Sequence, residues 1–100
     1  MTKLETAFTR DLLRSLAEAE KITGVSETRL AAQAEAQGGP AAVRQLLARG
    51  QTTRQFQPLQ RAKRLDLSVE ALVTKGKYAE LFTDDEANIC LSALLAGGLY

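Results

Sequence analysis

The stretch TDDEANICLSALLAGG at positions 83–98 contains signals for both ends of a helix. Thr83, followed three residues later by Glu86, matches a capping box, in which two side chains accept the N–H groups that begin a helix. Acidic residues in the first turn also stabilise a helix, because they interact favourably with the positive end of its dipole. Gly97-Gly98 is suited to end the helix. The stretch therefore predicts an α-helix, whose buried face is expected to comprise Ala87, Cys90, Leu91, Leu94 and Leu95.

Helical signals also precede this stretch along the chain. Apolar residues from Thr6 to Ile22 recur at the spacing of one helical face, and Gly24 is suited to end that helix. Ser26 is expected to cap a second helix, and Pro40 to lie in the first turn of a third. The expected helices are 6–22, 26–38, 40–50, 58–64, 68–76 and the last one, with an apolar turn at Tyr78, Leu81 and Phe82. The predicted fold is all-α, a compact array of about six short helices with no sheet, in a single domain over residues 1–100.

Composition narrows the classes of function. The 100 residues are 45% apolar and 25% charged, as in one ordinary soluble domain. No apolar run approaches the ~20 residues of a membrane span, and the N-terminus lacks a signal-peptide core, so a cytoplasmic protein without a membrane partner is expected. Cys90 is the only cysteine and histidine is absent, which removes the commonest bases and zinc ligands. We therefore expect no enzyme activity, no cofactor, no metal and no small-molecule substrate.

Charge is segregated along the chain. Residues 1–35 carry five basic and six acidic side chains, a net of −1, whereas residues 36–65 carry six basic and none acidic, a net of +6. Residues 66–100 carry two basic and six acidic side chains, a net of −4. The near-neutral total of +1 thus conceals a strongly basic central stretch.

Five of the six central cations are arginines, whose planar forks suit phosphate and carboxylate groups. If they converge on one face, they can bind a phosphate backbone or an acidic protein patch. The alternative is that they point in several directions and pair with the acidic C-terminal third. The predicted partner-binding residues are the six cations with one apolar anchor: Arg44, Arg49, Arg54, Phe56, Arg61, Lys63 and Arg64.

Other patterns have ordinary structural explanations. Residues 22–30 resemble a helix-turn-helix, but the second helix would carry one arginine against two glutamates, a poor surface for reading a DNA groove. Asp66, Glu70 and the acids at 84–86 are the only carboxylate grouping suited to a divalent metal. The capping box accounts for the acids at 84–86, and spacing supplies no third ligand beside Asp66 and Glu70. A metal-dependent nuclease is therefore rejected, and Cys90 is interpreted as a core residue.

Four blocks of the sequence resemble a widespread small bacterial module that also occurs on mobile elements. The blocks are G-P-A-A-V-R-Q-L-L at 39–47, F-x-x-L at 56–59, R-L-D-L-S-V-E-A-L-V at 64–73 and Y-x-x-L-F-T-x-x-E at 78–86. The resemblance extends from about Ile22 to the end of the chain, and the last two blocks are its specific part. It implies a helical scaffold that is not known to be catalytic, with Ser68 and Thr83 as caps.

The chain departs from that module in its basic stretch. The module has glycine before Phe56 and before the arginine of R-L-D-L, where this chain has Gln55 and Lys63. Size and composition are also similar to those of the phage-encoded anti-CRISPR inhibitors, which share no common motif. For a phage-encoded protein, the expected compartment is the cytoplasm of the bacterial host.

Two functions follow as predictions. The first is a non-enzymatic interaction protein that docks on a nucleic-acid-handling complex and modulates or inhibits it, as anti-CRISPR proteins do, with a protein or protein–nucleic acid complex as partner. The alternative is a nucleic-acid-binding accessory or regulatory domain that uses the same arginines. The two differ in how steeply binding depends on salt.

Overall fold

The computed structural model describes residues 2–50 and 52–99, in which every regular element is helical and no strand occurs. The prediction of an all-α fold is confirmed. The α-helices are α1 (Lys3–Thr23), α2 (Thr28–Gln37), α3 (Gly39–Ala48), α4 (Phe56–Arg61), α5 (Val69–Val73) and α6 (Asp84–Gly97), with 3₁₀ helices η1 (Leu65–Leu67) and η2 (Gly76–Leu81).

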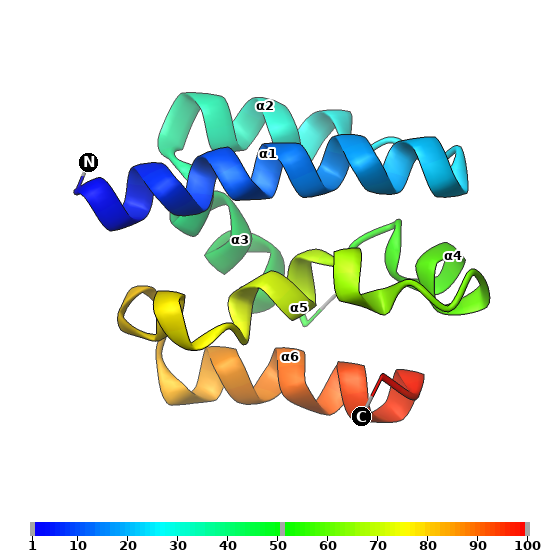
Figure 1. The fold of residues 1–100 in the computed structure, drawn as a ribbon. Coiled ribbons are helices and arrows are strands. Elements are labelled where there is room, and N and C mark those ends of the chain that lie inside the picture. The colour runs from blue at the N-terminus through cyan, green and yellow to red at the C-terminus, as the bar shows by residue number, and fades with distance from the viewer. Residues whose placement is uncertain (1, 51, 100) are drawn as a thin grey trace.

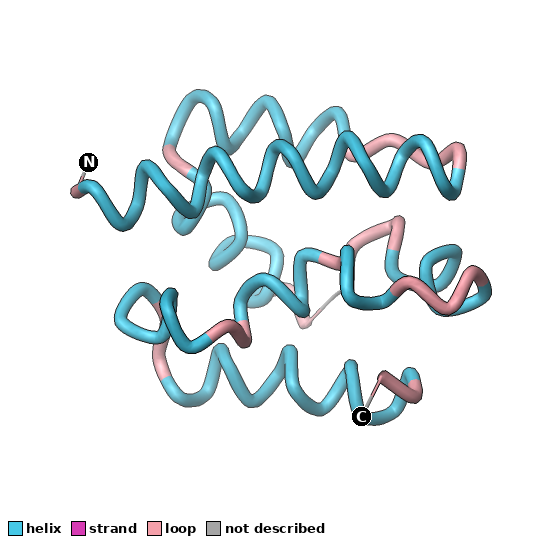
Figure 2. The backbone as a smooth tube through the Cα atoms, viewed as in Figure 1, coloured by secondary structure: helices cyan, strands magenta, loops and turns pink. Residues whose placement is uncertain are grey.

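The helices lie in three tiers (Figure 1). Helices α1 and α2 run side by side along one side of the molecule, and α6 lies along the opposite side. Helix α3, the short helices α4 and α5 and both 3₁₀ helices fill the space between them, joined by short loops (Figure 2). Helix α6 is therefore an outer element that packs mainly on α5.

Helix α1 is longer than the sequence pattern suggested. Thr2 caps it, because its hydroxyl accepts the Glu5 N–H at 3.1 Å while the Glu5 carboxylate accepts the Thr2 N–H at 3.1 Å. This second capping box starts the helix at Lys3, three residues before the predicted Thr6. Gly24 ends the helix in the left-handed conformation, with φ of 74°, as predicted.

The predicted cap of the second helix is wrong. Helix α2 begins at Thr28, Glu27 occupies the cap position, and no side chain accepts a capping hydrogen bond there. The Ser26 hydroxyl instead accepts a hydrogen bond from the Thr28 hydroxyl at 3.3 Å.

The fourth helix is shifted relative to the prediction. It begins at Phe56, which puts Pro58 in its third position. A missing N–H is harmless there, because the first turn has no intrahelical acceptor for it. The helix ends at Arg61, and Lys63 follows with a positive φ of 59°.

The caps predicted at Ser68 and Thr83 are present. The Ser68 hydroxyl accepts the Ala71 N–H at 3.1 Å at the start of α5, and Thr83 and Glu86 form the predicted capping box of α6. Helix α5 ends at Val73, earlier than the predicted boundary near residue 76. Helix α6 ends at Gly97, and Gly98 takes the left-handed conformation, as expected for this pair of glycines.

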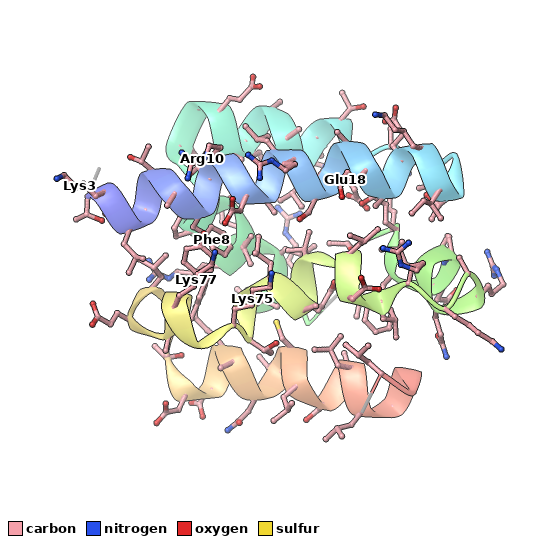
Figure 3. The ribbon with its side chains drawn as sticks, viewed as in Figure 1. Lys3, Phe8, Arg10, Glu18, Lys75 and Lys77 are labelled. Atoms are coloured by element: carbon pink, nitrogen blue, oxygen red, sulfur yellow. The ribbon has the colours of Figure 1, made fainter. Side chains whose placement is uncertain are left out.

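The main core joins α1, α2 and α3 to α5, η2 and the segment that begins α6. Phe8 points inward from α1 (Figure 3), and its ring meets Tyr78 edge-on, with centroids 5.0 Å apart. Phe82 is the other aromatic neighbour, with its centroid 5.2 Å from that of Phe8. Gly39 allows α3 to approach α1 closely, because a Cβ atom there would lie 3.0 Å from the Phe8 ring.

One part of the predicted core is wrong. Leu91 and Leu95 of α6 are 39% and 54% exposed, and Ile22 of α1 is also exposed. Of the face predicted for α6, Cys90 and Leu94 are buried as expected. The reason is the position of α6 at the edge of the molecule, where only one side of the helix meets other elements.

Candidate functional site

The structure divides the basic stretch among three places. Arg44 lies against the start of α6, and Arg49 and Arg54 line a groove beside α2. Of the remaining cations, Arg61 is the last residue of α4, and Lys63 and Arg64 follow that helix. All six cations are exposed. The residues predicted to form one partner-binding face therefore separate, and each group has different neighbours.

Arg44 is tied to the acidic C-terminal third. Its guanidinium donates a hydrogen bond to the Leu81 carbonyl, and its Nε lies 3.7 Å from a carboxylate oxygen of Glu86. The same guanidinium lies 5.7 Å from the centroid of the Phe82 ring. Arg44 thus behaves as the alternative interpretation expected, as an internal link between α3 and the segment that begins α6.

The cations after α4 occupy a separate part of the surface. Arg64 pairs with Asp66 at 3.2 Å. Lys63 borders a shallow pocket of about 510 Å³ that it shares with Gly97 and Gly98 at the end of α6. The positive φ of Lys63 is a conformation that glycine adopts without strain.

Phe56 is not an anchor for a partner. The side chain is only 6% exposed and belongs to the core cluster with Leu59, Leu65 and Leu94. A Cβ atom on Gly97 would lie 3.3 Å from the Phe56 ring, so α6 packs directly over it. The prediction of Phe56 as a partner-binding residue is corrected accordingly.

Arg49 and Arg54 line a groove together with Arg29 of α2. The groove has a volume of about 570 Å³, within the range of ligand pockets. We call it the arginine groove; its lining comprises Ser26, Glu27, Thr28, Arg29, Leu30, Ala32, Gln33, Leu46, Arg49, Thr52, Thr53 and Arg54. Three arginines from three separate segments thus meet in one concave site.

The loop that carries Arg54 is held by a buried carboxylate. The N–H of Thr53 donates to one oxygen of Glu70 at 2.9 Å, and the Thr53 hydroxyl donates to the other oxygen at 3.2 Å. Glu70 is only 2% exposed, and this burial raises the pKa of its carboxyl group. The hydrogen bonds of Thr53 therefore hold the loop against the core, while the side chain of Arg54 is exposed.

Gln55 holds the other end of the same loop. Its side-chain amide donates to the carbonyls of Leu16 at 3.1 Å and Val25 at 2.8 Å, and its backbone N–H donates to Glu27 at 3.0 Å. The side chain is buried. Although Gln55 lies within the basic stretch of the sequence, it is a connector inside the fold.

The arginines that line the groove are not paired with acids of this chain among residues 2–50 and 52–99. Within the described residues, ion pairs shorter than 4.0 Å join Arg44 to Glu86, Arg64 to Asp66 and Lys77 to Asp11. The groove arginines form none of these pairs. Glu27 is the one carboxylate among the lining residues, and it already accepts the Gln55 N–H. Three guanidinium groups therefore face solvent with hydrogen-bonding capacity to spare.

Sequence reasoning overlooked Arg29. Its segment was judged as a DNA-reading helix and set aside because two glutamates accompany the arginine. In the structure Arg29 works with residues far along the chain, so no spacing rule links it to Arg49 and Arg54.

Further cations lie outside the central stretch. Figure 3 shows Lys75 and Lys77 close to α1, on the side of the molecule that also carries Lys3 and Arg10. The Nζ atom of Lys77 lies 3.4 Å from a carboxylate oxygen of Asp11. The same carboxylate also accepts a hydrogen bond from the hydroxyl of Tyr78. Lys77 is therefore paired within the chain, whereas Lys3, Arg10 and Lys75 form no ion pair shorter than 4.0 Å among the described residues.

The carboxylates and the thiol behave as structural groups. Asp66 is exposed beside Arg64, whereas Glu70 is buried with Thr53. Across residues 2–50 and 52–99, no group of three metal-ligating side chains is close enough to hold an ion. Burial raises the pKa of Cys90 to about 12, so its thiol is not poised as a nucleophile.

Among the described helices, none has both the length and the apolar composition needed to cross a bilayer.

Comparisons with known proteins find no matching family model, no similar curated protein and no similar solved structure. The resemblance to the small bacterial module therefore stays a prediction that rests on the four sequence blocks.

Proposed function

We propose that this protein is a non-enzymatic interaction protein that docks on a nucleic-acid-handling complex through the arginine groove and modulates or inhibits that complex. The observation that carries the proposal is the convergence of Arg29, Arg49 and Arg54 in one groove, where none forms an ion pair within the described part of the chain. An inhibitor in the manner of the anti-CRISPR proteins is the specific form we favour.

The groove favours docking over a loose electrostatic contact. Its walls are fixed by the buried bonds of Thr53 to Glu70 and of Gln55 to two carbonyls. A pre-formed site loses less conformational entropy on binding than a flexible loop does. Arginine forks bind carboxylates in pairs, so an acidic side chain or a short acidic segment of the partner fits the site.

Direct binding of nucleic acid is the alternative, and the distribution of charge favours it less. A protein that follows a phosphate backbone needs a continuous basic track, whereas Arg44 and Arg64 are paired with acids of this chain. Three phosphate contacts would give a log–log salt slope of roughly −2 to −3.

The decisive experiment is affinity capture of the tagged protein from nuclease-treated bacterial lysate, followed by an activity assay of the captured complex. We expect recovery of a nucleic-acid-handling complex, inhibition of its activity, and loss of both effects when Arg49→Glu and Arg54→Glu are combined. Arg61→Glu is the matched control, because Arg61 is an exposed arginine that does not line the groove.

Two results would count against the proposal. One is capture of the same complex by the doubly substituted groove variant. The other is micromolar binding of the purified protein to a DNA duplex or single strand at ~50 mM salt with the slope given above, which would support the alternative.

A further inference from the structure

Helix α6 carries an exposed surface that differs from the rest of the molecule. Its exposed apolar residues include Ile89 at 45%, Leu91 at 39% and Leu95 at 54%. No charged residue occurs between positions 87 and 99, although a quarter of the whole chain is charged. We call this surface the α6 outer face; its exposed residues are Asn88, Ile89, Leu91, Ser92, Leu95 and Ala96.

The spacing on this face is that of a helix–helix seam. Asp84, Asn88, Leu91 and Leu95 follow one another at intervals of four, three and four residues, the heptad pattern that places side chains along one line facing a second helix. Ser92 and Ala96 lie on the same face, and their small side chains permit close approach of a neighbouring helix.

No described part of this chain covers the face. Helix α6 packs inward on α5 and α3 and buries Cys90 and Leu94. Figure 1 shows the helix along one side of the molecule, with α5 on its inner side. The leucines at 91 and 95 are therefore left open to a second molecule.

Charge at the two ends of α6 indicates which molecule fits. Its first turn carries Asp84 and Asp85, both exposed. At its other end, Lys63 borders the same pocket as Gly97 and Gly98. An antiparallel second copy of α6 places the acidic end of each helix near the lysine of the other.

We propose that the α6 outer face is a self-association surface, on which a second copy of this protein packs its own α6 in antiparallel orientation about a two-fold axis. Such an interface is isologous: Leu91 of each copy meets Leu95 of the other, and the Asp84–Lys63 contact occurs twice. A parallel arrangement would bring the two acidic ends together. An anionic membrane is a poorer occupant, because Asp84 and Asp85 flank one end of the apolar face and Lys63 is the only cation placed at the other end among the described residues.

The test is the molar mass of the full chain in solution. Sedimentation equilibrium at about 100 µM, where a dimer of micromolar Kd is filled, is expected to give twice the monomer mass of 10.8 kDa. Leu95→Lys is expected to return the protein to the monomer mass with unchanged helicity, because Leu95 is exposed. Ile22→Lys on α1 is the matched control for adding a lysine at an exposed apolar position and should leave the dimer intact.

Charge exchange tests the antiparallel orientation. Lys63→Asp and Asp84→Lys should each weaken the dimer several-fold, and the two together should restore it. Aspartate is a suitable substitute at Lys63 because it tolerates a positive φ. A monomer at about 100 µM, a dimer that survives Leu95→Lys, or a double exchange that fails to restore association each overturns the proposal. Binding to anionic phospholipid vesicles in place of self-association overturns it as well.

Discussion

The loop at residues 52–55 and the outer face of α6 invert the usual distribution of polarity. The loop buries Thr53 and Gln55, whereas α6 exposes Leu91 and Leu95. The buried polar groups all have hydrogen-bond partners within this chain, whereas both leucines are left partly exposed. Exceptions of this kind carry the most information about a protein. The comparison shows that the buried polar side chains of the loop stabilise the fold, whereas the exposed leucines of α6 are open to contact with a second molecule.

The largest effect is expected where the loop depends on Glu70. Glu70→Ala leaves the N–H and hydroxyl of Thr53 buried without an acceptor, and we expect a loss of about 3 kcal/mol in the free energy of unfolding. Urea denaturation followed by circular dichroism measures it. Glu80→Ala, at an exposed position, should change stability by less than about 0.5 kcal/mol. Equal effects of the two substitutions would contradict the structural role of the Glu70–Thr53 contact.

Gln55 should have the next largest effect. Gln55→Ala removes the donor shared by the carbonyls of Leu16 and Val25 and leaves a small void, so a loss of about 1.5 kcal/mol is expected. Gln57→Ala is the matched control, because Gln57 is exposed two residues further along. If thermal unfolding of the two variants coincides, the buried amide does not hold the loop.

The dependence of stability on pH provides a further test of the Glu70–Thr53 contact. Burial raises the folded-state pKa of Glu70 above its ordinary value of 4.5, so the folded protein holds this proton more tightly than the unfolded chain. Its contribution to stability is therefore present below pH 4.5 and is lost as pH rises through the folded-state pKa. Asp11 acts in the opposite sense, because hydrogen bonds from Tyr78 and Lys77 lower its pKa and its contribution is lost on acidification.

Glu70→Gln isolates the contribution of Glu70. The amide keeps an acceptor for the Thr53 N–H and carries no charge, so its stability relative to the original protein should improve as pH rises from 4.5 to neutral. Urea unfolding across this pH range provides the measurement. An unchanged difference between the two proteins at every pH would show that Glu70 does not titrate as burial requires.

The smallest effect on folding is expected on the α6 outer face. Leu95→Gln should change the free energy of unfolding by less than about 0.5 kcal/mol in dilute protein, since this side chain has little packing to lose within the monomer. Leu94→Gln, one residue earlier and fully buried, should cost about 3 kcal/mol or more. Urea titrations at low micromolar concentration compare them. A large loss for Leu95→Gln would place that leucine in the core after all.

Local signals predicted much of the scaffold. Several predicted helix ends are confirmed, because capping depends on neighbours within one helical turn. These are the starts at Ser68 and at Thr83 with Glu86, and the ends at Gly24 and Gly98. The capping box of Thr2 and Glu5 precedes the apolar pattern that predicts the start of α1, so periodicity does not indicate it.

The candidate site was less predictable, because it depends on contacts between distant segments. Arg29 joins Arg49 and Arg54 only once α2 and the loop are packed together. Likewise, the pairing of Arg44 with Glu86 and the burial of Phe56 follow from where α6 lies. Periodicity also could not distinguish Leu94 from Leu95, since the width of a helix's buried stripe is set by the number of neighbours around it.

The opposite placement of α2 and α6 has a consequence for how binding events combine. The arginine groove borders α2, so occupancy of the α6 outer face leaves the groove open. Two copies joined through α6 would carry their grooves toward opposite ends of one particle. Such a particle gains avidity on any target that repeats its binding site at a matching distance, since the second contact forms at high effective concentration.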